Sequence, residues 1–155
     1  MLLHDYAFVP VPAEWVCARI IADRREWLSG FAAGAAHEGE SLRLRVGPIG
    51  SLPMLSKTVT LQPDQPIVRG EATIVPLTWR ATGSQGIFPV LNADLEVSAL
   101  SPRITYLTLR GRYEPPFGAI GQRLGRSLLH RVAEATIRSF MRRLADSLAD
   151  TVADG

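Results

Sequence analysis

The hydrophobic and polar positions along the chain follow two different periods. Between Glu40 and Tyr113 apolar residues alternate with polar ones in several segments, which is the pattern of strands with one buried face. From Phe117 to about Asp150 apolar residues recur every three or four positions, as in an amphipathic helix. Thirty-odd helical residues span roughly 50 Å, whereas a compact chain of this length has a radius of gyration of about 15 Å. We therefore expect this helix to cross the whole domain, with the strands wrapped against it.

The apolar ladder of this helix has a spacing of four residues. It comprises Leu128, Val132, Thr136, Phe140, Leu144 and Leu148, beside a second row of Leu129, Ala133, Ile137 and Met141. Each four-residue step turns by about 40°, so the ladder winds around the helix. We expect its first half to face the sheet and its last two turns to contact the helix carrying Val16 and Ile20, a flanking strand or a second subunit. The alternative is one wide apolar face in an ordinary core.

The segments before the long helix predict a first strand, then two short helices, and then the remaining strands of one sheet. Expected strands lie at residues 4–9, 40–46, 55–61, 67–82, 87–99 and 104–113, with a turn at 83–86. A helix opens at Pro12 and runs through Ala22, burying Val16, Ile20 and either Cys17 or Ile21, and a second short helix carries residues 26–28. The expected fold is α+β: a curved antiparallel sheet of six or seven strands around one long C-terminal helix, with residues 1–155 forming one domain.

Composition is that of an ordinary globular protein. Of the 155 residues, 46% are hydrophobic and 21% charged. No apolar run approaches the ~20 residues that a membrane helix needs, so we expect no stable membrane insertion. Residues 1–5 lack the features of a secretory signal, which makes a cytoplasmic location the expectation. Cys17 is the only cysteine, which excludes an internal disulfide and a thiolate metal cage.

The net charge of +2 comes from sixteen arginines and one lysine among the 17 basic residues. Arg131, Arg138 and Arg142 share one side of the long helix, and Glu134 lies among them and partly neutralises the patch. A nucleic-acid interface would need a concentrated basic face with aromatic residues within it. We therefore expect a solvated helix face and no nucleic acid.

No sequence motif indicates a catalytic site. Nucleophile elbows, phosphate loops, dinucleotide fingerprints and paired-histidine zinc motifs are absent from the sequence. His130, with Glu134 one turn later, fits a surface or boundary residue better than a general base. Asp94 and Glu96 share the outward face of one strand, where solvated charges are commoner than a coupled carboxylate pair. We expect no cofactor and no metal, and whether the chain is an enzyme stays open.

Three segments carry a family resemblance. They are Phe8-Val9-Pro10-Val11-Pro12-Ala13-Glu14-Trp15-Val16 followed by Trp27-Leu28, then residues 75–83 (Val-Pro-Leu-Thr-Trp-Arg-Ala-Thr-Gly), and the tail from Pro115. With the order of elements, they resemble the START-related helix-grip superfamily (SRPBCC), which includes birch-pollen-allergen-like proteins, polyketide cyclases and lipid-transfer domains. The resemblance covers essentially the whole chain and implies an apolar cavity between sheet and long helix.

Residues of suitable face and position could line such a cavity. The apolar candidates are Trp27, Trp79, Leu91, Leu107, Phe117, Leu124 and Leu128, and the polar candidates are Arg80 and Tyr106. Trp79 and Arg80 are neighbours in one strand, so one of them points inward, and we expect it to be Trp79.

Three functions fit these observations. The first is binding or transport of a hydrophobic small molecule, such as a lipid or polyketide. The second is an aromatase/cyclase, which would require an inward ionisable group such as His130, Arg80 or Asp94. The third is an interaction module without a cavity, in which Trp27 and Trp79 fill the core. A homodimer is compatible with each.

Overall fold

A six-stranded antiparallel sheet and one long helix make up most of the described chain. The computed structural model describes residues 2–22, 28, 30–31, 58–82, 90–114 and 126–153. The strands are β1 (Leu2–Val9), β2 (Thr58–Pro63), β3 (Ile67–Arg69), β4 (Ala72–Thr82), β5 (Val90–Ser101) and β6 (Ile104–Glu114), and the helix is α3 (Arg126–Ala153). The strand order is β1-β6-β5-β4-β2, with β3 paired to β4 beside this path.

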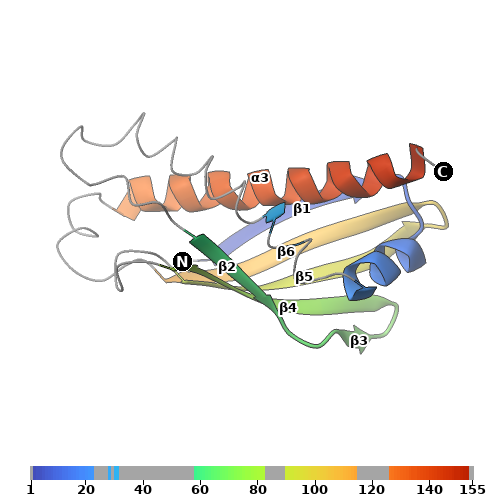
Figure 1. Ribbon diagram of the computed structural model, residues 1–155, viewed down its shortest axis with the longest axis horizontal. Helices are drawn as coiled ribbons and strands as arrows, with labels where there is room; N and C mark the ends of the chain where they lie inside the picture. Colours follow the sequence, from blue (N-terminus) through green and yellow to red (C-terminus); the bar gives the residue numbers. More distant parts are fainter. Residues whose placement is uncertain are drawn as a thin grey trace.

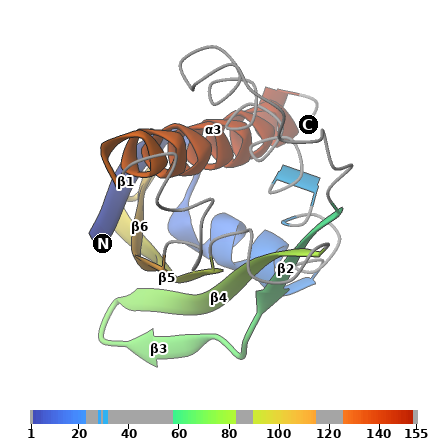
Figure 2. The ribbon, with the colours of Figure 1, turned by 90° about the vertical axis from the view of Figure 1, so that its left-hand side faces the viewer.

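The sheet curves around one side of the helix. Figure 1 shows α3 running along the length of the sheet. Seen from the end in Figure 2, the strands pass from β1 beside the helix through β6 and β5 to β4 and β2. We call the face toward α3 concave and the opposite face convex. This arrangement confirms the expected α+β fold with a curved sheet and a C-terminal helix.

Strand β5 shows how the alternating sequence divides between the two faces. Its buried residues are Leu91, Ala93, Leu95 and Val97, whereas Asn92 and Asp94 are exposed and Glu96 and Ser98 half-buried. The alternation of apolar and polar residues in this strand thus corresponds to its buried and outward faces, and the expected outward face of Asp94 and Glu96 is confirmed. Each buried side chain stands on the concave face because successive residues of a strand point to opposite sides.

Helix α3 buries a stripe rather than the full ladder. Its buried apolar residues are Ala133, Ile137, Phe140, Met141, Leu144 and Leu148. Thr136, a ladder member, is half-buried, because Ile137 and Met141 of the neighbouring row share the buried stripe. The helix packs mainly against β1 and less against β6. Leu144 and Leu148 belong to the same core cluster as Val16 and Ile20, and a separate contact of the last two turns stays a prediction.

The helix at residues 13–22 begins where Pro12 predicts. The carbonyl of Pro12 accepts hydrogen bonds from the amides of Trp15 (3.0 Å) and Val16 (3.3 Å). Of the two candidates for the third buried position, Cys17 is half-buried and Ile21 is exposed. The buried Thr105 hydroxyl donates to the carbonyl of Val11 at 2.6 Å, which ties β6 to the chain after β1.

One expected element is wrong. Residues 67–82 are not one long strand but β3 and β4, which pair with each other as a tight hairpin. Gly70 sits in the turn with φ of 62°, a conformation that glycine adopts without steric cost. The expected strand at 40–46 and the turn at 83–86 lie outside the described residues, as does most of the second short helix, of which Leu28, Gly30 and Phe31 are helical.

Gly111 of β6 is a position where the sheet has no room for a side chain. A Cβ there would lie 2.8 Å from Cδ1 of Leu91, 2.9 Å from Cβ of Ala93 and 3.1 Å from the carbonyl oxygen of Asn92. The side chains of β5 thus lean over Gly111 on the concave face.

We expect Gly111→Ala to lower the free energy of unfolding by about 1–3 kcal/mol, the usual cost of overpacking a core. Urea denaturation followed by circular dichroism measures it. The matched control is Gly30→Ala, because nothing lies within 4 Å of a Cβ at that helical position. Equal free energies of unfolding for Gly111→Ala and the unsubstituted protein would contradict the steric reading.

Candidate functional site on the concave face

A row of four side chains crosses the concave face beneath α3. Tyr113, Leu91, Trp79 and Leu61 are register neighbours on β6, β5, β4 and β2, and all four are buried. The Trp79 ring meets Phe140 of α3 edge to face, with ring centroids 5.4 Å apart and planes at 62°. Such a pair stabilises by about 0.5–1.5 kcal/mol beyond its buried area. The contact joins the helix to a strand that lies three places from β1 in the sheet.

Burial is less complete around this row than in the rest of the core. Trp79, Leu91, Ala93 and Ala133 each keep 8% of their surface exposed, whereas Leu95 and Leu107, farther along the same face, keep none. The four come from β4, β5 and α3. These four keep the largest exposed fractions among the described apolar residues of the core, although all four are buried.

Tyr113 brings a polar group to the row. Its side chain is 3% exposed, and burial raises the pKa of its phenol from 10.0 to about 12. Desolvation has this sign because it disfavours the charged phenolate. The phenol is therefore neutral throughout the physiological range and can exchange hydrogen bonds without carrying charge.

The structure places five of the nine predicted ligand-binding side chains. Trp79, Leu91 and Leu107 are buried on the concave face. Arg80 is exposed, on the side of β4 opposite Trp79, as expected. Tyr106 precedes Leu107 in β6 and lies on the convex face, where it stacks on Phe8 with centroids 5.2 Å apart. Arg80 and Tyr106 therefore do not belong to the concave site.

The other four predicted residues are not placed by their side chains. Trp27, Phe117 and Leu124 lie outside the described residues, and Leu128 belongs to α3 in a turn whose side chains are likewise outside them. The site also contains residues that sequence reasoning did not select, namely Tyr113, Phe140 and Ala133. Tyr113 has a usable signal, because it stands six residues after Leu107 and so shares its face.

The ionisable groups considered for catalysis stay at the surface or its boundary. Asp94 is exposed on the convex face. The His130 side chain is 36% exposed, which is the expected boundary position, and its Nε2 lies 3.1 Å from Oε1 of Glu134. Its Nδ1 is buried without a hydrogen-bond partner in the described part of the chain. Within that part, no group of three or more His, Cys, Asp or Glu could hold a metal ion, and no helix has the length and apolarity to span a membrane.

Known structures share this architecture. A conserved protein from Geobacillus kaustophilus is similar with a TM-score of 0.57 and 13% identity, over 96% of this chain and 95% of that one. The Zhui aromatase/cyclase from Streptomyces sp. R1128 is similar with a TM-score of 0.50 and 14% identity, over 98% and 95%. The chain has the helix-grip fold. No protein-family model and no curated protein matches the sequence.

The raised pKa of Tyr113 predicts a loss of stability in alkali. Between pH 10 and about 12 the phenol ionises in the unfolded chain but not in the folded one, so the unfolded state is favoured as pH rises. A gap of this size corresponds to about 2–3 kcal/mol. Between pH 9 and 11.5 we expect Tyr113→Phe to lose about 2 kcal/mol less free energy of unfolding than the unsubstituted protein, as measured by urea denaturation.

The control for this experiment is Tyr6→Phe, at a position that is 55% exposed. It should lose stability in alkali as the unsubstituted protein does. If the free energy of unfolding of Tyr113→Phe falls with pH as steeply as that of the unsubstituted protein, the phenol is not desolvated in the folded state.

Proposed function

We propose that the chain binds a hydrophobic small molecule, such as a lipid or a polyketide, between the concave face of the sheet and α3. The observation that carries the proposal is the Trp79–Phe140 contact, with Leu91 and Tyr113 beside it in one row. Apolar ligand surface buried against these side chains would gain about 25 cal/mol per Å². Tyr113 offers a neutral polar group at the end of the row, which suits a ligand with one polar end.

Incomplete burial gives the ligand a place to enter. Ala133 on α3 and Ala93 on β5 are small residues that, like Trp79 and Leu91, keep 8% of their surface exposed. A ligand seated there would cover the remaining exposed apolar surface. The likeness in fold to an aromatase/cyclase supports the idea that this architecture can house a small organic molecule.

An aromatase/cyclase remains the second candidate, and one observation favours it. The buried, unpartnered Nδ1 of His130 could accept a proton from a substrate on that side of α3. Against it, Arg80 and Asp94, the other two groups named for such chemistry, are exposed away from the concave face. A binding protein that performs no turnover therefore fits better.

Binding is tested with the neutral fluorescent probe N-phenyl-1-naphthylamine. We expect saturable fluorescence enhancement with the unsubstituted protein and at least a tenfold weaker affinity with Ala133→Leu, because the larger side chain fills the entry. Ala135→Leu is the matched control, since Ala135 is half-buried and lies about 200° around the same helix. Thermal melting of both variants shows whether they remain folded.

Two results would overturn the proposal: no saturable binding, or the same affinity for both variants. Native mass spectrometry of gently purified protein adds the identity of any bound molecule. Loss of water from a bound polyketide during incubation would show turnover and favour the cyclase, whereas an unchanged mass favours the carrier.

A further inference from the structure

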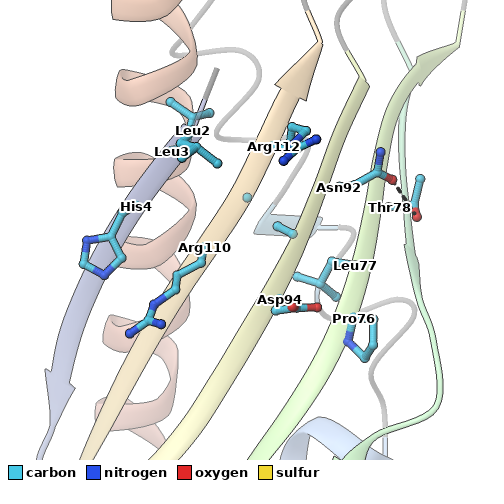
Figure 3. A pocket seen from close by; sticks show the side chains of 12 residues that line it. Leu2, Leu3, His4, Pro76, Leu77, Thr78, Asn92, Asp94, Arg110 and Arg112 are labelled. Atoms are coloured by element: carbon cyan, nitrogen blue, oxygen red, sulfur yellow. Dashed lines mark hydrogen bonds between the residues drawn. The ribbon is translucent and has the colours of Figure 1, made fainter.

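A groove of about 660 Å³ crosses four strands of the sheet (Figure 3). Its lining comes from β1, β6, β5 and β4: Leu2, Leu3, His4, Pro76, Leu77, Thr78, Asn92, Ala93, Asp94, Arg110, Gly111 and Arg112. His4, Asn92, Asp94, Arg110 and Arg112 are all exposed, which places the groove on the convex face. It is therefore separated from the concave site by the thickness of the sheet.

Strand alternation explains the shape of the groove. Leu3, Gly111, Ala93 and Leu77 form one row across β1, β6, β5 and β4, and three of the four are buried with side chains on the concave face. Toward the convex side this row offers backbone only. The rows on either side of it carry outward side chains, which make the two walls.

Cationic side chains gather at the β1–β6 end. Arg110 and Arg112 stand two residues apart on the convex face of β6, and His4 is the cross-strand neighbour of Arg110. The Cβ atoms of residues in these positions lie about 5–7 Å apart, so all three side chains can reach one small group. The lining holds two arginines against one carboxylate, Asp94, so its balance is positive.

The two arginines are available to a ligand. Although Asp94 is the cross-strand neighbour of Arg110, no ion pair joins them, and among the described residues no hydrogen bond engages either guanidinium. Figure 3 shows the Arg110 side chain directed toward β1, away from Asp94. The Oδ1 of Asn92 accepts a hydrogen bond from the Thr78 hydroxyl at 3.4 Å, and this leaves the Asn92 amide hydrogens as further donors.

We propose that the groove binds the carboxylate or phosphate group of a small organic anion, held by Arg110 and Arg112 with His4 and Asn92 as additional donors. A guanidinium forms paired hydrogen bonds with either oxyanion, which explains why arginine suits this position. Asp94 and Glu96 follow one another on the convex side of β5 and would repel the continuing charges of a nucleic acid or an acidic protein surface. A single anionic group at the β1–β6 end can be held on the β1 side of Arg110, toward which that side chain is directed, and so lies away from Asp94.

The adjoining surface suits the organic part of such a molecule. The ring centroids of His4 and Tyr6 lie 6.5 Å apart. The centroid of Tyr6 lies 5.7 Å from that of Phe8 and 6.1 Å from that of Tyr106. Tyr6 and Phe8 are each 55% exposed. An aromatic ring attached to the anionic group would find further rings to pack against beside His4.

The test is a titration of the full chain with phenyl phosphate and, separately, benzoate, followed by amide chemical shifts. We expect saturable shifts at Gly111, Asn92 and His4 with one or both probes, and the better probe identifies the anion class. Arg110→Gln and Arg112→Gln should each weaken binding at least tenfold. Arg103→Gln, in the β5–β6 turn, is the matched control and should bind as the unsubstituted protein does.

Three outcomes would overturn the proposal. One is that neither probe gives saturable shifts at these residues. Another is that Arg103→Gln weakens binding as much as the two groove variants, which would show general charge screening. The third is that binding appears only with vesicles containing phosphatidylglycerol, which would make the surface a membrane contact. Ala133→Leu, which changes only the concave face, should leave the binding of phenyl phosphate and benzoate unchanged. The two proposals can therefore fail independently.

Discussion

The contact between Trp79 and Phe140 is the interaction on which the arrangement of sheet and helix depends. Helix α3 packs mainly on β1, yet Trp79 belongs to β4, three places away in the strand order. The large Trp79 side chain covers that distance because the sheet curves, and it meets the Phe140 ring edge to face. The row of Tyr113, Leu91, Trp79 and Leu61 crosses the sheet at this contact. Strand register places Leu91 and Tyr113 beside Trp79 on the same face.

The sheet separates the proposed concave site from the proposed anion site in the convex groove, and the same residues contribute to both faces. Leu3, Gly111, Ala93 and Leu77 offer backbone to the convex groove, and the side chains of the buried three belong to the concave core. The space on the concave side is smallest at Gly111, because a Cβ there would clash with Leu91 and Ala93.

Sequence patterns predicted the elements better than the contacts between them. The alternation in β5 assigns its two faces, because period two depends only on the local backbone. The hairpin at Gly70 was missed because β-branched residues continue on both sides of the turn, and the sequence offers one glycine as its signal. Tyr106 was placed in the site together with Leu107, although adjacent strand residues cannot share a face. The arginines of the groove stand more than 100 residues from His4 in the sequence, and register alone joins them.

The charged side chains of β4, β5 and β6 stand on the convex face of the sheet, away from α3. Arg80, Asp94, Arg110 and Arg112 all stand on exposed positions, where water stabilises their charges. Tyr113, buried beside Trp79, is kept neutral because desolvation raises its pKa to about 12. A phenol that holds its proton so firmly can orient a ligand through a hydrogen bond but is a poor source of a base at neutral pH. In the described part of the chain, His130 of α3 has a buried Nδ1 without a hydrogen-bond partner, and it lies ten residues before Phe140 along the helix. A substrate that used this nitrogen would have to extend along the helix beyond the Trp79 row.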